Sequence, residues 1–184
     1  TVALGHTAGH FGNASAGTNA GATVVTHFMN AMDKGLNEHS FASFVIADER
    51  LTVELILDGH HVSFKTAKEI YAAVGDRLIF VSDAMAAAGA TDGDYTIGKL
   101  PVIVKDAVAR LQTNGSLAGS TLTMDVVFTN SIHELGLSIP QAVAATSTRA
   151  AQRMGLSDRG EIAVGKRADL LSYNQDTRSI TLIN

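Results

Sequence analysis

Four apolar runs rich in β-branched residues recur through the first half of the chain. Their hydrophobicity is nearly continuous, without the alternation of apolar and polar positions that marks a strand with one solvated face. Such runs are typical of parallel strands that helices cover on both faces. The predicted strands are Val2 to Leu4, Thr23 to Thr26, Leu51 to Leu57, and Arg77 to Val81.

Helix-compatible segments separate these runs, so strand and helix alternate along the chain. The predicted helices are Asn13 to Asn19, part of the Asn30 to Phe44 stretch, and Ser63 to Val74, with Ser63 as the N-cap. This order predicts an α/β fold with a parallel sheet and right-handed crossovers.

The pattern changes after Asp83. Small and turn-forming residues predict a loop from Ala84 to Asp94, and partial alternation predicts a strand pair or hairpin within Leu100 to Leu111. The rest of the chain predicts a turn at Thr113 to Ser116, helices over Leu122 to Gly136 and Ser138 to Met154, and short antiparallel strands within Gly160 to Leu171.

Composition and charge narrow the range of partners. The chain has 184 residues, 46% hydrophobic and 17% charged, which is typical of one main globular domain. A net charge of −4 without a basic cluster argues against nucleic acid as a partner. The apolar runs are far shorter than the ~20 residues that span a bilayer, so we expect no membrane partner.

The chain contains no cysteine. Disulfides and thiolate ligands are therefore excluded, and any metal must be held by histidine and carboxylate. This composition fits a cytoplasmic protein. The first residues form an apolar run without a methionine or a signal peptide, so the sequence reads as a chain entered midway.

Each predicted strand is followed at once by residues that could bind a metal or a substrate. His6, His27, the segment Asp58 to His61, and Asp83 come after the four strands in order. In parallel barrels the active site is gathered from the carboxyl ends of several strands. We therefore expect these side chains to share one site.

Imidazole and carboxylate form the ligand set of a catalytic zinc or related divalent site, where the metal activates a water molecule near neutral pH. A carboxylate beside that water can take up its proton and return it to a leaving amine, the general acid–base role that we assign to Asp83. A single histidine is more often structural than a ligand, and His10, His39 and His133 are interpreted as surface or supporting residues.

Two segments keep alternative interpretations. Asn30 and Ala31 could open a helix with Asn30 as its cap, or could offer an anion site beside His27. The segment Leu117 to Met124 could be only a turn and a helix cap.

Five motifs in this order resemble the N-acetylglucosamine-6-phosphate deacetylase family. They are Gly5-His6-Thr7, Thr26-His27-Phe28-Met29-Asn30-Ala31-Met32, Asp58-Gly59-His60-His61-Val62, Ser82-Asp83-Ala84, and Leu117-Ala118-Gly119-Ser120. The segments Ala145 to Ala151 and Arg159 to Asp169 resemble the ending of amidohydrolases more broadly.

The resemblance implies a (β/α)8 TIM barrel of amidohydrolase type, of which this chain covers about strands five to eight. Residues 1–158 would be the partial catalytic barrel, and residues 159–184 would add strands to a small β-sandwich domain. His6 and His27 would be metal ligands, joined by a glutamate from the first half of the barrel, which this sequence lacks. The expected ion is zinc, with iron, cobalt or manganese as alternatives.

The same resemblance implies the substrate contacts. His61 would contact the substrate and help to polarise the acetyl carbonyl, while Asp83 would be the catalytic acid–base. The residues that would line the sugar-phosphate site are Asn30, Ala31, Asp58, Gly59, His60, His61, Leu117, Ala118 and Gly119.

One departure from the family pattern concerns the phosphate. The family has an Arg-Glu-Pro-Gly stretch after the Asn-Ala-Met segment, and its arginine binds the substrate phosphate. Here the nearest counterpart is Asn37-Glu38-His39-Ser40. Lys34 could replace that arginine only as a point charge, without its two-pronged hydrogen bonding.

We therefore expect a metal-dependent deacetylase that acts on N-acetylglucosamine-6-phosphate or a related N-acetylated amino sugar, as a homodimer. One alternative is another amidohydrolase reaction, such as that of a cyclic amidase or deaminase. The other is a non-catalytic sugar-phosphate-binding relative.

Overall fold

The computed structural model describes residues 2–33, 35 and 37–183. Its centre is a four-stranded parallel sheet in the order β1-β2-β3-β4. The strands are β1 (Ala3–Leu4), β2 (Val24–Val25), β3 (Thr52–Ile56) and β4 (Leu78–Val81). All four predicted parallel strands are confirmed, although β1 and β2 are shorter than their apolar runs.

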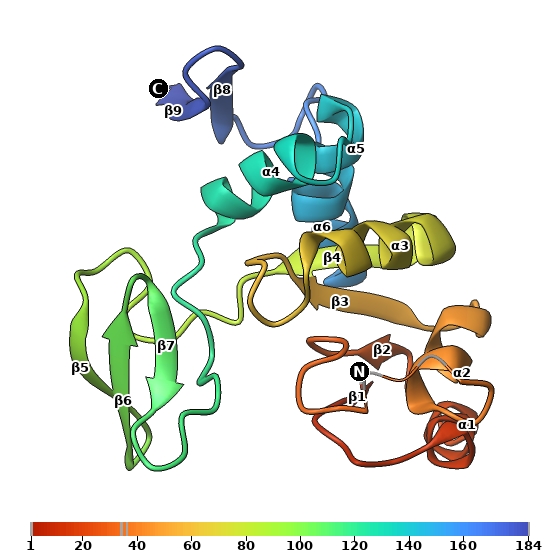
Figure 1. Ribbon diagram of the computed structural model, residues 1–184. Coiled ribbons are helices and arrows are strands. Elements are labelled where there is room, and N and C mark those ends of the chain that lie inside the picture. The colour runs from red at the N-terminus through yellow and green to blue at the C-terminus, as the bar shows by residue number, and fades with distance from the viewer. Residues whose placement is uncertain (1, 34, 36, 184) are drawn as a thin grey trace.

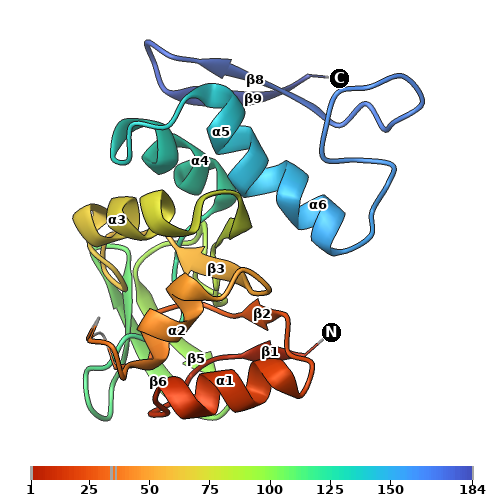
Figure 2. The ribbon, with the colours of Figure 1, turned by 90° about the vertical axis from the view of Figure 1, so that its right-hand side faces the viewer.

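Three helices cover one face of this sheet (Figures 1 and 2). They are α1 (Phe11–Asn19), α2 (Phe41–Ala47) and α3 (Phe64–Val74), and a single 3-10 turn, Gly75–Arg77, leads from α3 to β4. Strand residues such as Val53, Leu55 and Leu78 are fully buried against Ala67 and Ile70 of α3 in one apolar core. The alternation of strands and helices along the chain thus buries the parallel strands, as the sequence predicts.

The α1 and α3 predictions are confirmed, and Ser63 accepts a hydrogen bond from the Thr66 amide as the N-cap of α3. The helix expected in part of the Asn30 to Phe44 stretch is confirmed only at the end of that stretch, because α2 begins at Phe41 and continues to Ala47. Met29 and Ala31 have φ angles of 69° and 48°, which a right-handed helix does not allow. Ser40, rather than Asn30, caps the helix that forms.

After β4 the chain forms a separate antiparallel sheet beyond the carboxyl ends of β3 and β4 (Figure 1). Its strands are β5 (Gly93–Ile97), β6 (Leu100–Lys105) and β7 (Val108–Leu111). The predicted strand pair within residues 100–111 is confirmed. The sequence predicts a loop up to Asp94, whereas β5 begins at Gly93. Glycine and aspartate are typical of turns, and here their pairing with β6 makes them part of a strand.

The two predicted C-terminal helices are also confirmed. The first is α4 (Met124–His133); the second runs through α5 (Ile139–Val143), a π-helical turn at Ala144–Thr148, and α6 (Arg149–Arg153). Ser138 and Gln141 form a capping box at its start. Within the described part of the chain, no helix has the length and apolar character needed to cross a membrane.

The chain ends in a hairpin of β8 (Leu170–Asn174) and β9 (Ser179–Ile183). The strands expected within residues 160–171 therefore begin only at Leu170, and residues 160–169 form turns and coil. Ile162 and Val164 are almost fully exposed, so the apolar side chains of this segment are not buried against the described part of the chain. The pairing partner of β8 lies beyond the segment that was expected to form strands.

Candidate functional site

Three of the expected site residues share an uncommon backbone conformation. His6, His27 and Asp83 follow β1, β2 and β4, and their φ angles are 49°, 32° and 49°. Residues other than glycine seldom adopt positive φ, and strained conformations of this kind cluster at active sites. At each of these strand ends the chain turns sharply as it leaves the sheet.

The two histidines lie beside each other. Their ring centroids are 5.6 Å apart and their planes are inclined at 72°. Gly5 allows this approach, since a Cβ there would lie 2.6 Å from Cγ2 of Thr26. The Nδ1 atom of His27 is buried and has no hydrogen-bond partner among the residues that the structure describes. A buried nitrogen without a partner is costly unless a ligand satisfies it.

Asp58 holds the loop after β3 and orients His61. One of its carboxylate oxygens accepts the amide protons of His60 and His61 at 2.8 and 2.9 Å, and the other lies 2.7 Å from Nδ1 of His61. Burial alone would raise the pKa of Asp58, but these hydrogen bonds outweigh it and hold that pKa below its ordinary value. Asp58 is therefore a carboxylate that fixes the direction of the buried His61 ring.

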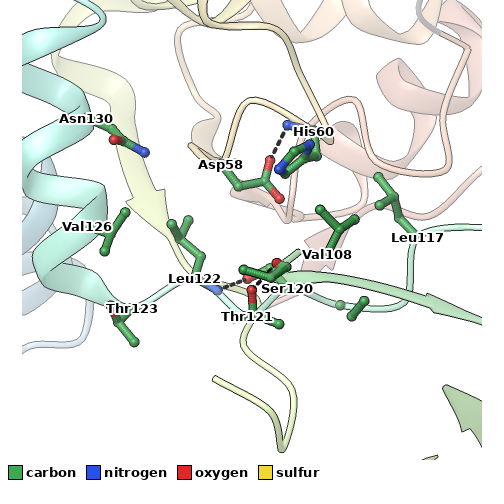
Figure 3. Close-up of a pocket in the computed structure, with 13 residues that line it drawn as sticks. Asp58, His60, Val108, Leu117, Ser120, Thr121, Leu122, Thr123, Val126 and Asn130 are labelled. Atoms are coloured by element: carbon green, nitrogen blue, oxygen red, sulfur yellow. Dashed lines mark hydrogen bonds between the residues drawn. The ribbon is translucent and has the colours of Figure 1, made fainter. Parts of the chain in front are cut away.

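A pocket of about 210 Å³ opens between this loop, β7 and the start of α4. Figure 3 shows Asp58 and His60 facing the segment that carries Ser120 and Leu122. Leu117 and Gly119 also line it, so the structure brings together four of the residues expected at the sugar-phosphate site.

Other expected residues lie elsewhere. Asn30 and Ala31 do not line this pocket; the Asn30 amide donates to the His27 carbonyl at 2.8 Å, and Ala31 is exposed. Ala118 is only 6% exposed and packs in the small core under the antiparallel sheet. Gly59 has φ of 77° beside the Phe64 ring, so its backbone shapes the loop.

Residues 37–40, the counterpart of the family's phosphate-binding stretch, lie just before α2. Ser40 is buried as the cap of α2, whereas Glu38 and His39 are exposed, with Oε1 of Glu38 lying 3.4 Å from Nε2 of His39. Lys34, named above as a substitute for the family's arginine, lies outside the described residues. His39 and Asn37 therefore present no two-pronged partner for a phosphate.

Sequence reasoning missed Asn130, which lies on α4 and lines the same pocket. Its Nδ2 donates to the carbonyl of Leu57, 2.9 Å away, at the end of β3. The two residues are 73 positions apart, so no local pattern could have paired them.

Among the described residues, no three histidine or carboxylate side chains lie close enough to form a metal site. His6 and His27 are thus an incomplete ligand set. The donor chemistry nevertheless fits a divalent ion, because two adjacent imidazoles leave a buried nitrogen unsatisfied.

Comparison with known proteins shows which family has this arrangement. Residues 105–181 match the model of the amidohydrolase family. A protein of Escherichia coli strain K12, named "Putative N-acetylgalactosamine-6-phosphate deacetylase", is 34% identical over 130 residues, covering 70% of this chain and 77% of that protein. The N-acetylgalactosamine-6-phosphate deacetylase of Escherichia coli O157:H7 is 33% identical over 94% of this chain and 46% of its own.

A solved structure agrees. A variant of N-acetyl-D-glucosamine-6-phosphate deacetylase from Mycobacterium smegmatis, in complex with N-acetyl-D-glucosamine-6-phosphate, superposes with a TM-score of 0.91 and 36% identity, over 98% of this chain and 49% of that one. The chain belongs to the N-acetylglucosamine-6-phosphate deacetylase family of amidohydrolases.

Membership in this family assigns a TIM-barrel-type fold, and members of the amidohydrolase family are generally metal-dependent. The four-stranded parallel sheet belongs to such a barrel, and the β5–β7 sheet is inserted after β4. The chain spans about half the length of most relatives it matches.

Proposed function

We propose that the chain supplies strands five to eight of a deacetylase barrel that removes the N-acetyl group from N-acetylglucosamine-6-phosphate or a related N-acetylated amino sugar. The products are acetate and the amino sugar. The observation that carries the proposal is the set of strand ends: His6, His27 and Asp83 each follow a parallel strand with positive φ. The similar structure from Mycobacterium smegmatis, solved with N-acetyl-D-glucosamine-6-phosphate, supports the substrate class.

His6 and His27 would hold the divalent ion, zinc in the first instance and iron, cobalt or manganese as alternatives. The support is their edge-to-face approach and the buried Nδ1 of His27. A carboxylate outside the described set would complete the ligands. When bound, such an ion supplies Lewis acidity that activates water and polarises the acetyl group.

His61 and Asp83 would carry the proton and charge changes. The Asp58 carboxylate directs the His61 ring, which then donates toward the acetyl carbonyl and stabilises its developing negative charge. Asp83 takes the proton released from the attacking water and returns it to the departing amine of the sugar. The pocket lined by Asp58, His60, Leu117 and Gly119 would receive the sugar, with Gly59, Ala118, Asn30 and Ala31 shaping its approaches.

The proposed substrates include sugars without a 6-phosphate, because Asn37 stands where the family has the arginine that binds this phosphate. A relaxed specificity between phosphorylated and plain N-acetylglucosamine follows. We further propose that residues 1–158 form the catalytic part and 159–184 part of a small β-sandwich, and that the protein acts as a cytoplasmic homodimer.

The test is acetate release by the full-length, metal-loaded protein from N-acetylglucosamine-6-phosphate and from N-acetylglucosamine. We expect Asp83→Asn to lower kcat by about 10²–10⁴-fold, the usual contribution of a general acid–base, while metal content stays the same. Asp176→Asn, which removes an exposed carboxylate in the β8–β9 turn, is the matched control and should leave the rate unchanged.

Other outcomes would redirect the assignment. Turnover of a cyclic amide but of neither amino sugar would favour another amidohydrolase reaction. Binding of the sugar phosphate without any turnover would favour a non-catalytic relative. Unchanged kcat in Asp83→Asn would remove that residue from the mechanism.

A further inference from the structure

Asp83 has a side chain whose direction nothing nearby fixes. It is exposed, and its carboxylate makes no hydrogen bond to any other described residue. The direction in which it leaves the main chain is set by the backbone of Asp83, which has φ of 49°. For a residue with a Cβ this conformation is strained and persists only where surrounding contacts impose it.

The contacts come from a segment that lies 37 residues further along the chain. Ser120 and Ala84 form a parallel bridge, in which the Ser120 amide donates to the Asp83 carbonyl at 2.8 Å and the Met85 amide donates to the Ser120 carbonyl at 2.8 Å. The first bond thus holds the peptide group that follows Asp83, and the second holds the next peptide group along the chain.

The side chain of Ser120 holds the peptide group that precedes Asp83. Its hydroxyl donates to the carbonyl of Ser82 and accepts the Leu122 amide at 3.0 Å. Ser120 is only 4% exposed, so both bonds are shielded from water. Because the peptide groups on both sides of Asp83 are hydrogen-bonded to Ser120, its φ and ψ angles are restrained.

Gly119 lets this segment come close enough. Its φ is 60°, and a Cβ there would lie 3.1 Å from the Asp83 carbonyl oxygen and 3.2 Å from Cβ of Met85. Any other residue would push the segment away from Asp83.

We propose that Ser120 is a positioning residue for the reaction: its buried hydroxyl, together with the backbone of Gly119 and Ser120, sets the direction of the Asp83 Cα–Cβ bond, from which the carboxylate projects. The inference rests on the proposed role of Asp83. It does not require Ser120 to touch substrate. It predicts that the hydroxyl acts on the chemical step and leaves substrate affinity alone.

The experiment compares Ser120→Ala, Ser120→Thr and Ser131→Ala in the full-length, metal-loaded protein. Ser131 is the matched control, because it is also fully buried and donates to a backbone carbonyl, that of Phe128, within α4. We expect Ser120→Ala to lower kcat by about 10- to 100-fold with KM unchanged, as for a misplaced catalytic group. Ser120→Thr, which keeps the hydroxyl, should restore the rate. Ser131→Ala should lose thermal stability but keep kcat.

A second readout does not depend on turnover. The backbone NMR shifts of Asp83 should move away from those of a positive-φ residue in Ser120→Ala, and should stay in place in Ser120→Thr and Ser131→Ala. Unmoved Asp83 shifts in Ser120→Ala would overturn the proposal, as would an equal loss of kcat in Ser131→Ala. If the wild-type protein releases no acetate, the proposed function fails, and the NMR comparison still decides whether Ser120 holds Asp83.

Discussion

The Asp58–His61 pair carries a buried charge at the mouth of the site. The Asp58 side chain is 10% exposed and that of His61 is 2% exposed, so both depend on each other rather than on water. Two backbone amides share the carboxylate, which keeps it ionised in spite of burial. The pair therefore contributes to folding stability as well as to the orientation of His61.

We expect Asp58→Asn to lower the free energy of unfolding at neutral pH by about 1–3 kcal/mol, the usual contribution of hydrogen bonds to a charged group. The pKa of Asp58 is lower in the folded chain than its ordinary value of 3.8. The stabilisation is thus complete above pH ~4 and is lost as the pH falls through the lower, folded-state pKa.

Urea unfolding of both proteins from neutral to strongly acid pH measures this contribution. The stability difference between wild type and Asp58→Asn should shrink below about pH 4. A difference that stays constant down to the acid limit would contradict the ionic role of Asp58.

For the histidine pair, we expect His27→Ala to weaken zinc binding by more than about tenfold, since even the loss of a residue that only supports a ligand costs about that much. His133→Ala is the control, because His133 interacts with the Tyr173 hydroxyl on another part of the surface. Competition with a coloured chelator gives both affinities. Equal weakening in the two variants would mean that His27 is not a ligand.

Among the secondary-structure elements, the close approach of the β1 and β2 ends depends on one glycine. A side chain at Gly5 would meet both Cγ2 and the carbonyl oxygen of Thr26, at 2.6 and 3.0 Å. The two strand ends carry His6 and His27, so their spacing sets the distance between the imidazoles.

Gly5→Ala should therefore destabilise the fold by about 1–3 kcal/mol, the cost of overpacking, and should weaken zinc binding at the same time. Gly12→Ala, in the first turn of α1 with open space around the new methyl group, should be neutral or stabilising by up to about 1 kcal/mol. Thermal unfolding and metal titration of the pair test this. Unchanged metal affinity in Gly5→Ala would mean that the spacing of the two strand ends does not control metal binding.

The elements that could be predicted are those whose cause lies within a few residues. The apolar runs predict β1 to β4, Ser63 predicts the start of α3, and Ser138 with Pro140 predicts the start of α5. The strand-end residues His6, His27 and Asp83 could be predicted because parallel strands bring their carboxyl ends to one edge.

The parts that were missed depend on distant partners. β5 is a strand because it pairs with β6, which its own sequence does not indicate. α2 starts late because Met29 and Ala31 adopt positive φ angles, which a right-handed helix does not allow. Asn130 contacts Leu57, and Ser120 contacts Ser82, across 73 and 38 positions. Such contacts are a product of the folded topology, so neither periodicity nor a motif reveals them.

At the scale of the whole molecule, the four-stranded sheet has two open edges. Among the described residues no strand pairs with the outer edge of β1 or of β4. Val2, beside β1, is 62% exposed. A groove of about 280 Å³ lies beside β4, and its lining includes apolar side chains such as Ile79 and Met154 together with the charged Glu54 and Arg153. Unpaired strand edges with apolar neighbours invite association with other chains.

We therefore expect the 184-residue chain to self-associate in a concentration-dependent way, as light scattering after size-exclusion chromatography would show. Val2→Lys should reduce the association, because a charge beside an edge strand opposes pairing. Val164→Lys, a substitution at a fully exposed position away from the sheet, should not. A chain that stays monomeric at all concentrations would contradict the expectation.

The C-terminal hairpin lies at the end of a mostly exposed connecting segment. It touches the helical part through Tyr173, whose ring stacks edge-on with Phe128 at 5.1 Å and whose hydroxyl reaches His133. Residues 154–169, mostly exposed, connect it to α6. The contact of Tyr173 with α4 is therefore intramolecular. For a short flexible linker the effective concentration of such a contact is of millimolar order, and a change in the length of the connecting segment alters it without changing either surface.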